Sequence, residues 1–264
     1  REINYIRSFQ AKYPNAKIGL VIAMTSLRES LKSVFRKIPG LKPSIIINPS
    51  ETFNLKEKYD LLIVDEAHRL RQYKNIGWMG AFKKNNQKLG LDDTGNELDW
   101  ILANSKNQIF FYDSAQSVKP SDIDESYFDK LLKDNNTLNL QLTSQMRVKG
   151  GNNYISFVDE LLHVKRKTTE HFEIQDYELM TFDSLNDLYD ELRKREELHG
   201  LSRLVAGYSW PWASKNDKNA IDIEIDGLQF QWNQTEKDWV NSPTAFLEVG
   251  SIHTIQGYDL NYTG

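Results

Sequence analysis

The feature that most constrains the fold of this chain is an apolar run that ends in two adjacent acids. Leu61–Val64 is continuously apolar, and Asp65 and Glu66 follow it directly. Such a run fits a strand that is buried on both faces of a parallel sheet. An ionised carboxylate beside a buried strand must be paired, hydrogen-bonded or placed near a cation. Because ligands bind at the carboxyl ends of strands in open α/β sheets, the run predicts an α/β fold with a polar site at the end of this strand.

The two acids allow two interpretations, and the acids alone leave both open. In the first, Asp65 is a partner for Mg²⁺, held directly or through water, and Glu66 is a general base for an attacking water molecule. In the second, one of them caps a helix N-terminus or complements its dipole.

Composition narrows the class of protein. The net charge of −4 argues against an overall basic nucleic-acid-binding surface, although a local groove can still be basic. Cysteine is absent, which excludes disulfides and thiolate metal sites and is compatible with the reducing cytoplasm, where we expect the protein. There is no apolar run of about 18 residues, so we expect no membrane span. The start of the chain, Arg1–Arg7, has neither an initiating Met nor a signal segment and resembles the interior of a longer protein.

The segments before this strand predict the rest of an α/β unit. Lys17–Met24 is typical of a buried strand, and a helix is expected from Ser26, which has capping-box spacing to Glu29. Pro43–Asn48 indicates a second short strand, which completes a β-α-β-β order. After the acids, residues 75–94 are polar and weakly periodic and predict a long loop.

A second strand also ends in an acid. Gln108–Asp113 is expected to be a buried strand that ends in an acid, and Gln116 follows in the next turn. Asp113 and Gln116 together can sense a γ-phosphate, or its loss, through water, Mg²⁺ or Glu66. Turn chemistry alone would explain the same pair. Ser121 is expected to cap a helix that runs through Leu132.

The middle of the chain predicts another strand and a boundary. Thr137–Leu142 alternates polar and apolar residues, as a half-buried strand does. It leads to Arg147, whose planar guanidinium can reach a phosphate across a cleft, although a surface ion pair is the simpler role. Gly150–Gly151 is the best boundary between domains, and the apolar stripe of the following helix, from Tyr154 to Leu162, is expected to be core.

The second half carries three further signals. A helix from Ser184 to Leu198 is expected to stop at Gly200, and an Asp-Gly turn predicts a hairpin over residues 221–232. Trp210 and Trp212 flank Pro211 and can form a stacking platform for a base or a packed loop. His253–Asp259 offers short donors and a flexible backbone to a phosphate edge or a nucleic-acid backbone.

Taken in order, Asp65–His68, Asp113 with Gln116, Gln145–Arg147 and His253–Asp259 resemble motifs II, III, IV and V of superfamily-one helicases. The strings VDEAHRL, FYDSAQSVKPSDI, LTSQMR, AGYSWPWASK and IHTIQGYDL are similar to a bacterial family of Schlafen-like helicase-domain proteins, labelled a domain of unknown function. The resemblance spans nearly the whole chain, and its specificity comes from the combination and order of the motifs.

The resemblance implies two RecA-like lobes with mainly parallel sheets, residues 1–149 and residues 150–264, with the hairpin at 221–232 as an insertion in the second. ATP and Mg²⁺ would lie in the cleft between the lobes, and single-stranded DNA or RNA would run across both. Asp65 would hold Mg²⁺, Glu66 would activate water, and Gln116 would couple nucleotide state to nucleic acid. The resemblance places further residues at the nucleotide: Asp113, Arg147 at the γ-phosphate, Gln256, Gly257 and Asp259, the last where helicases commonly have Glu. The residues implied at the nucleic acid are Thr25, Ser26, Trp210, Trp212, His253 and Thr254.

Two departures from the family pattern qualify this expectation. The sequence has no Gly-x-x-x-x-Gly-Lys-Ser/Thr phosphate loop, and it stops at Gly264, before a sixth motif. We therefore expect a fragment, with the first lobe truncated at its N-terminus and the second at its C-terminus, that hydrolyses ATP only in a longer protein. A fused nuclease or other module can lie outside this sequence.

Two other functions remain as alternatives. A degenerate helicase core could bind nucleic acid or protein without ATPase activity. A Mg²⁺-dependent nuclease could use Asp65, Glu66 and Asp113, but no lysine lies at the usual short spacing from these acids.

Overall fold

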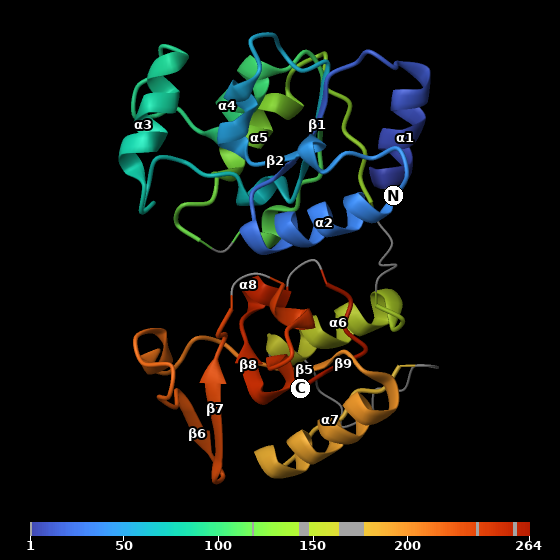
Figure 1. Cartoon of the computed structure of the whole chain (residues 1–264), viewed down its shortest axis with the longest axis vertical. Helices are drawn as coiled ribbons and strands as arrows, with labels where there is room; N and C mark the ends of the chain where they lie inside the picture. The colour runs from blue at the N-terminus through green and yellow to red at the C-terminus, as the bar shows by residue number, and fades with distance from the viewer. Residues whose placement is uncertain (1, 118, 143–147, 164–176, 236–237, 256–257) are drawn as a thin grey trace. The chain divides into compact units, whose positions relative to one another are not determined.

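The computed structural model describes residues 2–117, 119–142, 148–163, 177–235, 238–255 and 258–264. The chain forms two compact units, drawn in Figure 1: unit 1 comprises Arg1–Thr137 with Glu236–Asp238, and unit 2 comprises Leu138–Thr235 with Trp239–Gly264. The first segment of unit 1 ends at Thr137, and the division into two lobes at Gly150 stays a prediction. Each unit is described by itself.

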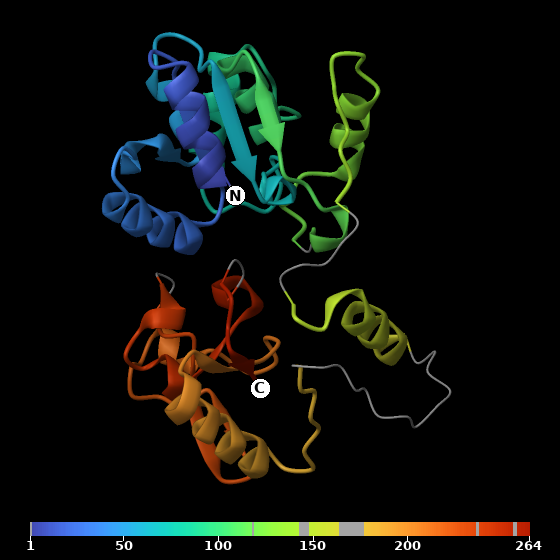
Figure 2. The same ribbon diagram turned by 90° about the vertical axis from the view of Figure 1, so that its right-hand side faces the viewer.

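Unit 1 is built on a parallel sheet of four strands in the order β2-β1-β3-β4. All three strand pairs are parallel, and Figure 2 shows β3 beside β4 with α1 in front of the sheet. The strands are β1 (Ile18–Ile22), β2 (Ile46–Ile47), β3 (Leu61–Asp65) and β4 (Gln108–Phe110). The helices are α1 (Glu2–Lys12), α2 (Thr25–Lys37), α3 (Met79–Lys88), α4 (Glu97–Asn104) and α5 (Glu125–Leu132), with 3-10 turns η1 (Pro43–Ile45), η2 (Pro49–Asn54), η3 (Ala67–Arg69) and η4 (Ser114–Gln116).

Helices cover both faces of this sheet because its central strands are apolar on both sides. Leu62 and Val64 pack into one cluster with residues of α4 and α5, whereas Leu61 and Ile63 pack into another with residues of α1 and α2. Each of these four side chains is at most 4% exposed, and burying one stabilises the fold by roughly 1.5–3 kcal/mol. The predicted α/β class with a buried parallel strand at residues 61–65 is confirmed, and the RecA-like assignment stays a prediction.

Two helix starts differ from the prediction. The capping box at Ser26 is wrong, because α2 begins at Thr25 with Met24 as its N-cap and without a side-chain capping bond. The helix therefore starts too early for Ser26 to precede it. The cap at Ser121 is also wrong: α5 is capped by Asp124, whose Oδ1 accepts a hydrogen bond from Ser126 N at 3.0 Å. Residues 121–123 cannot join the helix because their backbone pairs with residues 70–72.

The long loop predicted over residues 75–94 contains α3. Phe82 on α3 is fully buried against Trp100 of α4, with ring centroids 4.4 Å apart. Asn86 fixes the end of the helix, because its Nδ2 donates to Asp92 O and Gly95 O while its Oδ1 accepts from Trp100 Nε1 at 2.7 Å. The contacts of Phe82 and Asn86 with Trp100 therefore stabilise a helix that the weakly periodic sequence of this segment does not predict.

Two other predictions near the middle of the chain are wrong. Thr137–Leu142 forms no strand, and Leu138, Leu140 and Leu142 are 79%, 78% and 80% exposed. An alternating segment becomes a half-buried strand only beside another strand, and no described strand pairs with it. The helix α6 (Gly151–Leu162) exists as predicted, but none of its residues is buried, so its apolar stripe is not core.

Unit 2 contains a mixed sheet of five strands in the order β6-β7-β8-β5-β9, in which only β6 and β7 are antiparallel. The strands are β5 (Ser202–Val205), β6 (Ile223–Ile225), β7 (Leu228–Trp232), β8 (Glu248–Gly250) and β9 (Tyr262–Thr263). The remaining elements are α6, α7 (Leu185–His199), α8 (Ile252–Ile255), η5 (Ala213–Lys215), η6 (Trp239–Asn241) and η7 (Ala245–Leu247).

Two sequence signals in unit 2 are confirmed. The β6–β7 hairpin turns at Asp226 and Gly227, which have φ angles of 53° and 79°, as a two-residue Asp-Gly turn requires. The helix α7 is capped by Ser184 and ends at Gly200, whose φ is 67°. Within the described ranges, the structure contains no helix that combines the length and the apolar character needed to cross a bilayer.

Candidate functional site

The predicted acids of unit 1 lie at one edge of the parallel sheet. In the sheet register, Asp65 is opposite Ile22 at the end of β1, and Val64 is opposite Phe110 at the end of β4. The segments that follow these strands therefore leave the sheet at the same edge. This brings Asp65 and Glu66 after β3, Asp113 and Gln116 after β4, and Thr25 after β1 to the carboxyl edge of the sheet.

The chain turns sharply at the second acid. Glu66 has left-handed backbone angles, φ 51° and ψ 48°, and its side chain makes no capping bond to η3. Its backbone N donates to Asp65 Oδ1 at 3.0 Å, and the next residue, Ala67, donates its N–H to Phe111 O at 2.8 Å. Both acid side chains are half-buried. Glu66 thus precedes η3 without capping it through its side chain, and the turn presents the two carboxylates at the sheet edge.

A buried histidine lies against Glu66. His68 Nε2 is 2.9 Å from Glu66 Oε2, and the His68 side chain is 2% exposed. Neither ring nitrogen has hydrogen-bond geometry with a described residue, so this is a close polar contact rather than a directed hydrogen bond. The contact restricts the rotamers available to Glu66 at the edge of the sheet.

The residues after β4 form a small polar turn. Asp113 Oδ1 accepts from Ala115 N at 3.1 Å, and its Oδ2 accepts from Gln116 Nε2 at 2.8 Å. Asp113 and Gln116 are both exposed. The turn chemistry that the sequence allowed is therefore present, and it holds the amide of Gln116 beside a carboxylate.

The turn after β3 and the loop after β4 are joined by a buried ion pair. Arg69 Nη1 donates to Asp122 Oδ2 at 2.9 Å, and the two side chains are 8% and 3% exposed. Around this pair, Ile123 N donates to Leu70 O at 2.7 Å and Gln72 N donates to Ser121 O at 3.0 Å. The two segments therefore pair like short antiparallel strands.

A second buried acid supports the same turn from α4. Glu97 is 3% exposed; its Oε2 accepts from Arg71 N at 2.9 Å and its own N donates to Arg71 O at 3.0 Å. Burial raises the pKa of Glu97 to about 7, although the nearby cations Arg71 and Arg28 oppose the shift. Burial likewise lowers the pKa of Arg28, which donates to Ile22 O at 2.8 Å at the end of β1.

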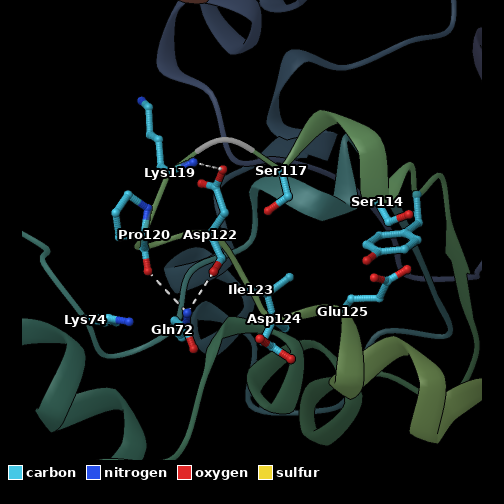
Figure 3. A pocket seen from close by; sticks show the side chains of 11 residues that line it. Gln72, Lys74, Ser114, Ser117, Lys119, Pro120, Asp122, Ile123, Asp124 and Glu125 are labelled. Carbon is cyan, nitrogen blue, oxygen red and sulfur yellow. Dashed lines mark hydrogen bonds between the residues drawn. The ribbon is translucent and has the colours of Figure 1, made fainter. Parts of the chain in front are cut away.

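A cavity of about 290 Å³ opens beside these loops. Figure 3 shows Asp122 between Lys119 and Gln72, with hydrogen bonds from Lys119 N to Asp122 Oδ2 and from Gln72 Nε2 to the carbonyls of Pro120 and Asp122. Its lining is polar and of mixed charge: Gln72, Lys74, Tyr112, Ser114, Ser117, Lys119, Pro120, Asp122, Ile123, Asp124 and Glu125.

The residues predicted in unit 2 occupy varied surroundings. Trp210 and Trp212 are half-buried and pack against the main core of the unit, with Lys215 Nζ 5.5 Å from the Trp212 ring centroid. Thr254 is 5% exposed, and its Oγ1 accepts from Ser251 N and donates to Ser251 O. Asp259 is exposed. The predictions for Arg147, Gln256 and Gly257, and for the side chains of Ser26 and His253, lie outside what the structure describes.

The carboxylate oxygens at the edge are of the chemical type that could hold Mg²⁺. No group of three or more potential ligands clusters among the described residues, so a cage made only of protein side chains is not present there. Mg²⁺ commonly takes one or two carboxylates and completes its shell with water and substrate phosphates. Asp65, half-buried at the end of β3, is a carboxylate that could take that role.

Sequence reasoning assigned no role to His68, Arg69, Glu97 or Asp122, although three of them lie in the strings that resemble the family. Arg69 and Asp122 are 53 residues apart, and neither position shows a pattern that would pair it with the other. Glu97 could have been noted as the first residue of the predicted helix near Leu98, but its burial depends on the turn at Arg71.

The structure shows an α/β protein with a parallel sheet and acids at the carboxyl edge of that sheet, where open α/β sheets bind ligands. A comparison with protein families identifies the family to which the chain belongs. Residues 15–264 match the family described as Schlafen group 3, DNA/RNA helicase domain. The chain belongs to this family, and the predicted helicase-like character is confirmed.

One curated relative is an uncharacterized protein of Saccharomyces cerevisiae. It is 23% identical over 252 residues, which cover 84% of this chain and 51% of the relative. The chain thus spans about half the length of the curated relative that it matches. No solved structure matches the chain.

Proposed function

We propose that this chain is part of an ATP-dependent DNA or RNA helicase or translocase, with ATP and Mg²⁺ as its cofactors. The observation that carries the proposal is the pair Asp65 and Glu66 at the carboxyl end of β3, next to the loop that holds Gln116, in a chain of a helicase-domain family. A protein that only binds nucleic acid does not require a carboxylate placed to activate water.

The proposal gives each edge residue a role. Asp65 holds Mg²⁺, Glu66 takes a proton from the attacking water, and Gln116 couples nucleotide state to nucleic acid. Arg147 contacts the γ-phosphate, and Asp113, Gln256, Gly257 and Asp259 complete the nucleotide site. The single-stranded nucleic acid is contacted by Thr25, Ser26, Trp210, Trp212, His253 and Thr254.

Hydrolysis needs one more part, a phosphate-binding loop that cradles the β- and γ-phosphates. The sequence contains no Gly-x-x-x-x-Gly-Lys-Ser/Thr segment. The same observation favours a second candidate function, a helicase-derived module that binds nucleic acid or protein without hydrolysis. The proposal for an ATPase therefore includes phosphate-binding residues that flank this chain in the natural protein.

The test is Mg²⁺-dependent ATP hydrolysis by the protein in its full natural length, with and without single-stranded DNA or RNA. We expect hydrolysis that nucleic acid stimulates, and a kcat about 10²–10⁴-fold lower in Glu66→Gln, because the amide cannot accept the proton. Glu197→Gln is the matched control, since Glu197 is an exposed residue of α7. Absence of hydrolysis in the wild-type protein, with nucleic-acid binding intact, would leave the binding module as the function.

A further inference from the structure

The loop that carries Gln116 is tethered to the acid turn at both of its ends. We define the acid turn as residues 65–72 and the Gln116 loop as residues 112–117 with 119–121. Just before the loop, Phe111 O accepts the N–H of Ala67 at 2.8 Å. At the far end, Ser121 O accepts from Gln72 N at 3.0 Å, and Ile123 N donates to Leu70 O at 2.7 Å. The loop therefore leaves the acid turn and returns to it.

The side chain of Asp122 joins the two segments. Asp122 Oδ2 accepts from Arg69 Nη1 at 2.9 Å and also from Lys119 N at 3.0 Å. Arg69 lies in the acid turn, and Lys119 lies in the Gln116 loop. Because the side chains of Arg69 and Asp122 are 8% and 3% exposed, water does not compete with this ion pair as it does on the surface.

Packing contributes little to the position of the loop. The cavity of about 290 Å³ lies along it, and Tyr112, Ser114, Ser117 and Lys119 of the loop line this cavity. Of the four, Tyr112 packs on a helix, with its ring centroid 4.0 Å from that of Phe128. The others are exposed, so the polar tethers at the ends hold the remainder of the loop in place.

We propose that Arg69 and Asp122 are positioning residues that make the acid turn and the Gln116 loop move as one body. A change at Glu66 that accompanies nucleotide binding or hydrolysis is then transmitted through the ion pair to Gln116, and from there to bound nucleic acid. This inference rests on the proposed function, because it assigns the coupling step of that same site. Neither residue touches the reacting atoms.

The test measures ATP hydrolysis by the full-length protein with and without saturating single-stranded nucleic acid. Asp122→Asn removes the charge and leaves an oxygen that can accept from Lys119 N. We expect the stimulation of kcat by nucleic acid to fall at least about fivefold, the lower end of typical coupling between sites, with the KM for ATP unchanged. A second variant, Arg69→Met with Asp122→Leu, replaces the buried pair by apolar groups, a change that commonly preserves folding.

The matched control breaks another arginine pair. Arg203 Nη1 is 3.1 Å from Glu196 Oε1 in unit 2, and the Arg203 side chain is 7% exposed. Glu196→Gln should lower the thermal midpoint without reducing stimulation. An equal loss of stimulation in Glu196→Gln, or full stimulation in both Arg69/Asp122 variants, would overturn the coupling role.

A second readout separates this inference from the proposed function. Amide hydrogen exchange of residues 113–117, measured without nucleotide, should be faster in Asp122→Asn than in the wild type and unchanged in Glu196→Gln. Unchanged exchange in Asp122→Asn would overturn the tether whatever the enzyme does. Absence of hydrolysis in the wild-type protein would instead overturn the proposed function and, with it, the coupling role, even where exchange shows the tether.

Discussion

Two buried acids, one in each unit, have pKa values shifted in opposite directions. Glu97 in unit 1 is 3% exposed, and burial raises its pKa to about 7. Asp222 in unit 2 is 8% exposed, and burial raises its pKa too, but hydrogen bonds from Ser214 and Trp232 outweigh burial and the pKa is lowered. The comparison shows that the balance between burial and hydrogen bonds to the carboxylate decides which charge state the fold prefers: burial prevails at Glu97, and hydrogen bonds prevail at Asp222.

The two carboxylates differ in the hydrogen-bond donors that surround them. Asp222 Oδ1 accepts from Ser214 N at 2.8 Å, and its Oδ2 accepts from Trp232 N at 2.6 Å and from the Ser214 hydroxyl. Glu97 Oε2 accepts a hydrogen bond from Arg71 N at 2.9 Å, and the charges of Arg71 and Arg28 also act to lower the pKa of Glu97. Asp222 is therefore a structural anion that joins η5 to β7, whereas Glu97 lies at the point of changing its charge near neutral pH.

The largest expected effect comes from removing the buried carboxylate of Asp222 in unit 2. Asp222→Ala leaves three buried donors of Ser214 and Trp232 without their acceptor, and we expect the free energy of unfolding to fall by about 4 kcal/mol. Urea unfolding at pH 7 measures it. Asp217→Ala, at an exposed position of the same loop, is the control. A loss in Asp222→Ala no larger than in the control would mean that water replaces the carboxylate and that donor count does not explain the comparison.

The second prediction tests the raised pKa of Glu97 in unit 1 by measuring stability at two pH values. The pKa of Glu97 is raised from 4.5 to about 7, so the folded state binds more protons than the unfolded state between these values. The free energy of unfolding therefore falls as pH rises through this window, by roughly 3 kcal/mol for a shift of this size. Glu97→Gln should lack this component of the pH dependence, measured by urea unfolding at pH 5 and pH 8. Identical pH dependence in the variant and the wild type would contradict the raised pKa.

The smallest expected effect comes from removing an acceptor that lies near the surface, the hydroxyl of Ser184. Ser184 Oγ accepts from Asp187 N at 3.1 Å at the start of α7, near solvent. Ser184→Ala should lower the free energy of unfolding by only about 1 kcal/mol, because water can reach the released N–H. Ser184→Thr keeps the hydroxyl and should stay close to the wild type. A loss as large as that of Asp222→Ala would show that burial does not set the cost of removing an acceptor.

The elements that the sequence predicted well are those whose pattern is local. The apolar run before Asp65 predicts a buried parallel strand, and Asp226-Gly227 predicts a hairpin, because each needs only neighbouring residues. The prediction failed at Thr137–Leu142 and at residues 75–94, where the outcome depends on a partner distant in sequence. A strand needs a neighbour, and α3 depends on Trp100.

For the candidate site, too, the local features were predicted and the long-range contacts were not. Strand ends located Asp65, Glu66, Asp113 and Gln116 at one edge, since parallel strands share an edge. The motifs contain the residues that fix these side chains but do not predict their contacts: His68 lies against Glu66, and Arg69 pairs with Asp122. No spacing rule connects residues 53 positions apart, so only the folded chain reveals them.

The left-handed backbone of Glu66 has a consequence for how this position can change. A residue other than glycine pays roughly 1–2 kcal/mol to adopt such angles, so glycine would fit the turn with less strain. A mutation to glycine would therefore relax the backbone and remove the carboxylate in one step. At residue 66, glycine would favour the stability of the fold, whereas glutamate supplies the carboxylate at the sheet edge. The two requirements therefore favour different residues.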